Sequence, residues 1–162
     1  MNPELVALAE QVLAENRAAG RCVAMAESCT GGLVAAALTE IPGSSDVFDR
    51  GFVTYSNEAK IAMLGVSEDV LSTFGAVSVA TAWAMAKGAL AASNADVAVS
   101  ITGIAGPGGA TQGKPVGMVV FAREVRGEDP ETVVADTRQF GDLGRSEIRR
   151  QAAMVALELL RP

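Results

Sequence analysis

The apolar positions of this chain fall into short runs separated by polar turns, and these runs predict strands. Five such strands are expected, at residues 22–26, 51–55, 96–103, 117–124 and 131–140. The last two are joined by the polar sequence RGEDP (126–130), which is typical of a hairpin turn. The chain therefore ends its sheet with a predicted antiparallel pair.

Between the early strands the apolar positions recur at helical spacing. Serine and asparagine side chains can accept from the first free N–H groups of a helix. Such residues precede several of these segments and predict where the helices start. Helices are predicted from Pro3 to a stop at Gly20, over 30–40, after Ser56 or Asn57, after Ser67, after Ser78, and from about Ser146 to Leu160. Strands that alternate with helices predict one α/β domain over residues 1–162.

Composition limits the possible functions. The chain has 162 residues, of which 49% are apolar and only 4% aromatic, so small aliphatic side chains must fill the core. The net charge is −6 and no basic cluster stands out, which argues against a nucleic-acid partner. Arg149 and Arg150 are expected on a helix surface. Two cysteines are too few for a disulfide scaffold.

No apolar run approaches the ~18 residues that a membrane span needs. The N-terminal sequence MNPELVALAE has no basic segment and carries acidic residues, unlike a signal peptide. We therefore expect a soluble, cytoplasmic protein that does not contact a membrane.

The absence of histidine restricts the available chemistry. It excludes Ser-His-Asp and Cys-His catalysis, and two cysteines cannot build a four-thiolate zinc site. Lysine is the recognised alternative base for a serine when burial keeps its amine neutral. Ser28 lies in AESCTGG (26–32), between a predicted strand and a helix. Lys60 lies in the first turn of another helix, five residues after Tyr55, the only tyrosine.

Ser28, Lys60 and Tyr55 therefore form a candidate catalytic group. The alternative is structural: Lys60 would be a surface helix residue and Tyr55 a half-buried strand residue. Cys29 is a rival nucleophile, because a helix N-terminus lowers a thiol pKa, although burial is the simpler explanation for it. The free N–H groups around Thr30 and Gly31 would suit an oxyanion or a phosphate.

A glycine-rich loop follows the strand at 96–103. Its segment GGATQGKP (108–115) has the glycine and lysine spacing of a nucleotide-binding P-loop. That motif requires Ser or Thr next and then a helix, whereas Pro115 and a predicted strand follow here. The match is interpreted as accidental. The loop still offers many unblocked N–H groups to a ring or a phosphate, unless it is an ordinary connection.

Four ordered motifs, AESCTGG (26–32), GFVTYSNEAK (51–60), SITGIAGPGG (100–109) and FGDLGRSEIRRQ (140–151), resemble the C-terminal domain family of competence-damage-inducible (CinA-type) proteins. The resemblance spans nearly the whole chain. It implies a three-layer α/β/α sandwich with a mixed central sheet, assembled as a homodimer. Stand-alone members are nicotinamide-nucleotide amidohydrolases, so it also implies hydrolysis of nicotinamide mononucleotide without a metal or cofactor.

The resemblance implies roles for individual residues. Ser28 becomes the nucleophile, with Lys60 and Tyr55 as its partners. Substrate contacts are expected from residues of three motifs, namely Cys29, Thr30, Gly31, Thr102, Gly103, Ala105, Gly106 and Arg145. Arg145 is the expected phosphate ligand, although GDLGR departs from the compact G-D-R of the family, which leaves Asp142 without a clear role.

Two other functions remain open on the sequence. The chain could be a nucleotide-binding module without catalysis, regulatory or linked to DNA uptake, which would keep the glycine loop but not need Lys60. It could also hydrolyse the amide of a different small pyridine or nucleoside by the same mechanism.

Overall fold

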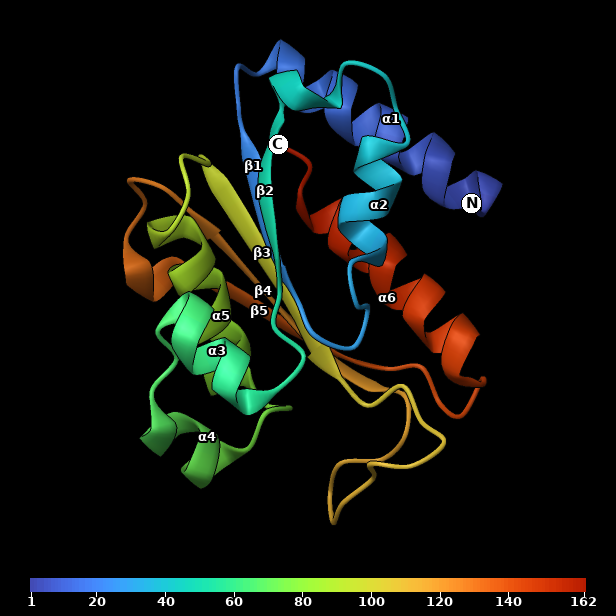
Figure 1. Ribbon diagram of the computed structural model, residues 1–162, viewed down its shortest axis with the longest axis vertical. Helices are drawn as coiled ribbons and strands as arrows, with labels where there is room; N and C mark the ends of the chain where they lie inside the picture. Colours follow the sequence, from blue (N-terminus) through green and yellow to red (C-terminus); the bar gives the residue numbers. More distant parts are fainter.

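The computed structural model describes residues 1–162 as a five-stranded sheet between two layers of helices (Figure 1). The strand order is β2-β1-β3-β4-β5; β1 pairs in parallel with β2 and β3, and β4 is antiparallel to β3 and β5. The strands are β1 (Val23–Glu27), β2 (Phe48–Val53), β3 (Val97–Gly103), β4 (Met118–Val125) and β5 (Val134–Gln139). The predicted three-layer α/β/α sandwich with a mixed sheet is confirmed.

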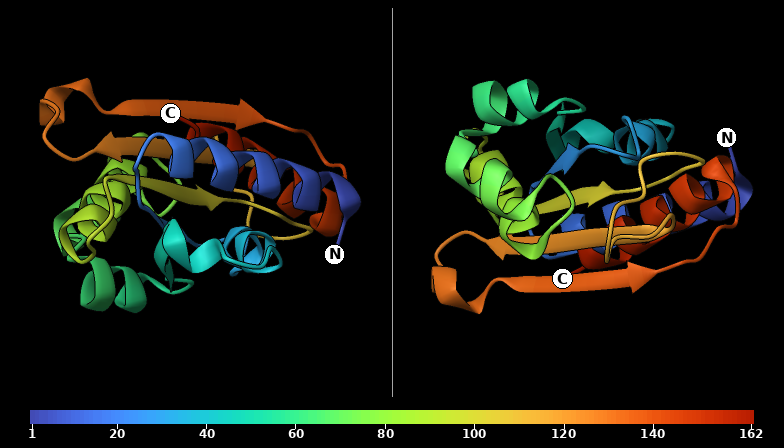
Figure 2. Two further views of the ribbon diagram at one scale, coloured as in Figure 1. Left: turned by 90° about the horizontal axis from the view of Figure 1, so that it is seen from above. Right: turned by 90° about the horizontal axis from the view of Figure 1, so that it is seen from below.

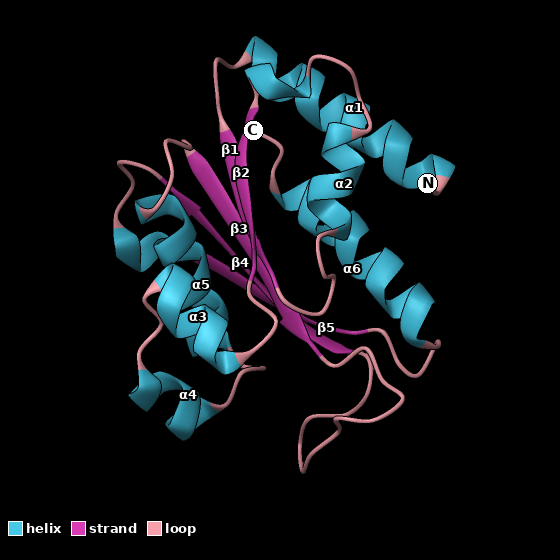
Figure 3. Ribbon diagram, in the orientation of Figure 1, coloured by secondary structure: helices cyan, strands magenta, loops and turns pink.

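The helices divide between the two faces of the sheet. Seen along the layers, α1, α2 and α6 lie on one side and α3, α4 and α5 on the other (Figures 2 and 3). Their bounds are α1 (Pro3–Ala18), α2 (Leu33–Thr39), α3 (Asn57–Leu64), α4 (Glu68–Phe74), α5 (Val79–Ala91) and α6 (Arg145–Leu159), with 3-10 turns at Ser44–Asp46 and Pro130–Thr132. None of these helices combines the length and the apolarity that crossing a bilayer requires.

The predicted caps hold the helices as expected. Asn2 accepts from the N–H groups of Glu4 and Leu5 at the start of α1. Ser56, Ser67 and Ser78 each accept from the N–H three residues on and open α3, α4 and α5. These bonds satisfy donors that have no partner inside a helix.

The boundaries of three elements differ from the sequence prediction by three residues. The strand predicted at 131–140 is β5, which begins only at Val134 because Pro130–Thr132 form a 3-10 turn. β2 begins at Phe48, three residues before the expected strand, because its pairing with β1 carries the polar pair Asp49–Arg50 into the sheet edge. α2 begins at Leu33 rather than at Thr30. Gly31 and Gly32 adopt left-handed φ values of 59° and 96°, which end the preceding turn and delay the helix.

β1 is the centre of the arrangement, and all five of its residues are buried. Val23 and Met25 join the core under α1, α2 and α6, whereas Ala24 and Ala26 join the core under α5. After β1 the chain enters α2 on one face of the sheet, and after β2 it enters α3 on the other face. Ligands of open α/β sheets bind beyond the carboxyl ends of the strands at such a switch point.

Candidate active site

A cavity of about 320 Å³ opens beyond the carboxyl ends of β1 and β3. Nine of the sequence-predicted site residues line it: Ser28, Cys29, Tyr55, Lys60, Thr102, Gly103, Ala105, Gly106 and Arg145. Thr30 and Gly31 do not line it, and Asp142 also lies outside it. The structure thus gathers residues from four distant motifs around one space.

Lys60 and Ser28 contact one another in this cavity. The Lys60 Nζ lies 3.0 Å from the Ser28 Oγ, 2.8 Å from the carbonyl oxygen of Thr54 and 3.4 Å from that of Tyr55. A neutral amine has two N–H donors and one lone pair. As an ammonium, Lys60 donates to all three oxygens. As a neutral amine it donates to the two carbonyls, and its lone pair can accept the Ser28 hydroxyl proton.

Local structure explains how the two side chains meet. Ser28 follows β1 directly, and its N–H donates to the carbonyl of Ile101 on β3 at 2.9 Å. Lys60 is the fourth residue of α3, and helical side chains point back toward the helix N-terminus. The lysine therefore reaches back across the end of β2 to the end of β1.

Burial sets the protonation of the candidate groups. Lys60 is only 1% exposed, and desolvation lowers the pKa of its ammonium from 10.5, with a smaller opposing contribution from Cys29. Burial also raises the pKa of the Cys29 thiol to about 12. Cys29 is thus a protonated, inert thiol at neutral pH, which favours Ser28 as the nucleophile.

Tyr55 differs from the expectation that its phenol lies beside the serine and lysine. Its backbone carbonyl faces Lys60, while its hydroxyl accepts from the Arg145 Nη2 at 2.7 Å. The Arg145 Nη1 donates to the carbonyl of Gly106 at 2.7 Å. The Tyr55–Arg145 pair therefore bridges the β2–α3 connection and the glycine loop at the rim of the cavity.

Glu27 is a residue of this site that the sequence analysis missed. It is 1% exposed, and its carboxylate accepts from the N–H groups of Gly32, Val34 and Ala35 at 3.1, 3.1 and 2.9 Å. It thereby joins the end of β1 to the start of α2 and closes the turn that carries Ser28. The sequence did contain a signal for this role, because an acidic residue directly before a strand-to-helix turn can accept from the free N–H groups of the helix.

Replacement of Glu27 by alanine should lower the free energy of unfolding by about 3 kcal/mol, since three N–H groups at the start of α2, one of them buried and two part-buried, lose their acceptor. Glu27→Gln should cost less, because its amide oxygen can still accept. Urea denaturation of both variants measures this. Equal stability of Glu27→Ala and the unsubstituted chain would contradict the capping role.

The prediction that Arg149 serves only the surface of a helix is wrong. Its Nε donates to the carbonyl of Cys29 at 3.1 Å and its Nη2 to that of Thr30 at 3.0 Å. It ties α6 to the turn after Ser28. Arg150 does serve the surface, in ion pairs with Glu4 and Glu147.

The turn and the glycine loop both present unpaired backbone donors. The Gly31 N–H donates to the carbonyl of Ser28 at 3.0 Å, so it is occupied. The N–H groups of Cys29 and Thr30 donate to no carbonyl, and neither do those of Ala105 and Gly106. These are the groups available to an oxyanion beside Ser28.

The charge of the cavity is opposite to that of the chain. Two basic residues line it, Arg145 and the titratable Lys60, and no carboxylate faces it, although the chain carries −6 overall. Such a space favours an anionic ligand.

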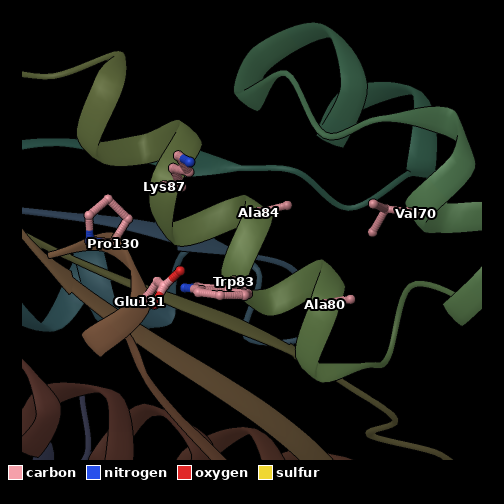
Figure 4. Close-up of a pocket in the computed structure, with 7 residues that line it drawn as sticks. All are labelled: Val70, Ala80, Trp83, Ala84, Lys87, Pro130 and Glu131. Atoms are coloured by element: carbon pink, nitrogen blue, oxygen red, sulfur yellow. The ribbon is translucent and has the colours of Figure 1, made fainter.

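A second cavity of about 320 Å³ lies between α4, α5 and the β4–β5 connection (Figure 4). Trp83 and Glu131 point toward one another across it, and Lys87 lies nearby. No hydroxyl or thiol lines it. It lacks a hydroxyl or thiol nucleophile and is not the candidate active site.

The fold and the site define an α/β protein with a buried serine–lysine pair beside a cavity at the carboxyl ends of its parallel strands. The chain belongs to the CinA C-terminal domain family, whose model matches residues 5–162. It is 51% identical over 158 residues to the nicotinamide-nucleotide amidohydrolase PncC of Escherichia coli K12, covering 97% of this chain and 93% of that protein.

Longer relatives share only this region. The chain is 54% identical over 144 residues to a CinA-like protein of Mycolicibacterium paratuberculosis, which covers 88% of this chain but 33% of that protein. It spans about a third of the length of such relatives. The crystal structure of the competence/damage inducible protein CihA from Agrobacterium tumefaciens superposes with a TM-score of 0.94 at 51% identity, covering 99% of this chain and 95% of that one.

Proposed function

We propose that this protein is a nicotinamide-nucleotide amidohydrolase that converts nicotinamide mononucleotide to nicotinate mononucleotide and ammonia. The observation that carries the proposal is the buried Lys60 Nζ, 3.0 Å from the Ser28 hydroxyl in a cavity without carboxylates. The relatives named amidohydrolases, of nearly the same length, support the substrate class.

The first half of the reaction forms an acyl-enzyme. The Ser28 Oγ attacks the carboxamide carbon while Lys60 takes the hydroxyl proton. The N–H groups of Cys29 and Thr30, or those of Ala105 and Gly106, hold the oxyanion. The carbon–nitrogen bond then breaks as the Lys60 ammonium returns its proton to the leaving nitrogen, which departs as ammonia.

The second half restores the enzyme. Lys60, again neutral, takes a proton from a water molecule that attacks the nicotinoyl ester. The bond between carbon and the Ser28 Oγ breaks, and the proton on Lys60 returns to the serine. One amine therefore serves as base and acid in both halves. No step requires a metal or a cofactor.

Arg145 is proposed to bind the substrate, and Tyr55 to position Arg145 through its hydroxyl. The phenol has no hydrogen bond to Lys60 or Ser28, so proton transfer is assigned to the lysine alone. The positive charge of Arg145 attracts the anionic nucleotide into the cavity from a distance, an effect that the uncharged nicotinamide does not feel.

Ammonia release from nicotinamide mononucleotide by the purified protein tests the proposal. We expect turnover that is unchanged by EDTA, with lower kcat/KM for free nicotinamide. Binding of the mononucleotide without turnover would instead indicate a non-catalytic module. A better substrate in a panel of pyridine amides would correct the substrate while keeping the reaction.

We also propose that the enzyme is a homodimer. Phe74, Val79 and Trp83 are 51%, 48% and 39% exposed on α4 and α5, and such apolar side chains favour a partner surface. Light scattering should give twice the chain mass of 16.6 kDa. A monomer at micromolar concentration would contradict it.

A further inference from the structure

A smaller cavity adjoins the candidate active site along the glycine loop. It has a volume of about 240 Å³, and four of its lining residues, Ala76, Val77, Ile104 and Gly109, also line the cavity of Ser28. The two spaces therefore share a wall of side chains and backbone. A ligand longer than one ring that leaves the cavity of Ser28 over this wall would reach the second space, which we call the extension.

Lys114 is the only charged residue that lines the extension. Its Nζ donates to the carbonyl of Phe74 at 2.6 Å and to no other protein group. An ammonium has three N–H donors, so two of them remain for a ligand. No carboxylate lines the extension to balance this charge.

The backbone of the loop adds further donors. Gly109 lines both cavities, and its neighbour Gly108 lines the cavity of Ser28. The N–H groups of both donate to no protein acceptor, and Gly109 has a left-handed φ of 93°. Reciprocal hydrogen bonds of 3.0 Å between Thr111 and Lys114 pin the tip of the loop. Successive free N–H groups in such a conformation form an anion-binding concavity.

We propose that Lys114 and the N–H groups of Gly108 and Gly109 form the subsite for the substrate phosphate. This inference rests on the proposed function, in which the carboxamide lies at Ser28. The phosphate then occupies the extension, which Arg145 does not line, and Arg145 contacts the part of the nucleotide that stays in the cavity of Ser28. The segment GGATQGKP (108–115) is not a P-loop, because a strand and not a helix follows it. Its glycine N–H groups and its lysine are nevertheless the same kinds of donor that a P-loop offers to phosphate.

A pair of substrates that differ only in the phosphate tests the subsite. Lys114→Met should raise KM for nicotinamide mononucleotide about 10- to 100-fold with little change in kcat, as expected for the loss of a charge-assisted contact. KM for the phosphate-free nicotinamide riboside should stay the same. Lys114→Arg should retain most of the affinity, and Lys87→Met, on exposed α5, is the matched control.

Three kinetic results would overturn the proposal. Equal losses with both substrates would show that Lys114 only anchors the loop through the Phe74 carbonyl. Unchanged KM values would show that the phosphate does not reach it. Loss of discrimination in Arg145→Met, but not in Lys114→Met, would place the phosphate at Arg145 beside Tyr55.

Titration with inorganic phosphate separates this inference from the proposed reaction. The amide NMR signals of Gly108 and Gly109 should shift on titration, and these shifts should disappear in Lys114→Met. If the protein hydrolyses neither substrate, the proposed function fails, and this titration alone decides the subsite. Signals that do not move in the unsubstituted chain would reject it.

Discussion

Replacement of Ser28 by alanine is expected to lower kcat/KM for nicotinamide mononucleotide by a factor on the order of 10⁴ or more. The methyl group keeps the turn after β1 but removes the atom that forms the acyl-enzyme. Because Ser28 is 8% exposed and its backbone N–H still donates to Ile101, stability should change little. Ammonia release and thermal unfolding, measured on the same preparation, check both statements.

The neighbouring cysteine provides the matched control. Cys29→Ala should keep activity within a few-fold, because burial raises the pKa of this thiol to about 12 and leaves almost no thiolate at pH 7. It should cost about 1 kcal/mol in stability for the small buried volume lost. An active Ser28→Ala together with an inactive Cys29→Ala would move the nucleophile to residue 29.

Trapping the intermediate extends this test. Rapid quenching during turnover, followed by digestion and mass spectrometry, should find a nicotinoyl group on the peptide that contains Ser28. Ser28→Ala should give none. A burst of ammonia equal to the enzyme concentration would show that ester hydrolysis is the slower half of the reaction.

The sequence could predict the parts of this site that depend on local patterns. Apolar runs and capping serines placed the strands and helices, and the strand-to-helix turn at Ser28 follows from the two glycines after it. The parallel neighbours β1 and β3 then bring AESCTGG and TGIAGPGG to one edge, as expected for strands that end together.

Side-chain pairings across the chain could not be predicted in the same way. Arg149 is one turn after Arg145 on a helix with a polar face, and nothing local says that it reaches the Cys29 carbonyl 120 residues away. Tyr55 points to Arg145 and not to Lys60 because α6 delivers the guanidinium to the cavity rim. Such contacts depend on how the layers pack, which no single segment encodes.

Replacement of Lys60 is the second change for which we expect a large loss of activity. Lys60→Met should lower kcat/KM by a factor of about 10²–10⁴, since it removes the only base beside Ser28. Lys60→Arg should be at least as inactive, because a guanidinium stays protonated at any working pH. Lys87→Met, the substitution of an exposed lysine on α5, should leave kcat/KM unchanged.

The pH–rate profile reports the state of this amine. Desolvation lowers the Lys60 pKa, so log kcat/KM should rise with pH through that lowered pKa and reach its plateau below 10.5, the ordinary lysine value. A profile that rises only near 10.5 would mean that the base is a solvated lysine. A profile without any rise at all would exclude Lys60 as the base.

Stability provides an independent readout of the same pKa. Between the lowered folded-state pKa of Lys60 and the unfolded value near 10.5, the unfolded chain binds more protons than the folded one. Its free energy of unfolding should therefore rise with pH across this window. Lys60→Met lacks the titrating amine, so the stability difference between the unsubstituted chain and this variant should shift in favour of the lysine as the pH increases. Urea denaturation at several pH values up to 10.5 measures this difference, and a constant value would show that the amine is solvated in the folded protein.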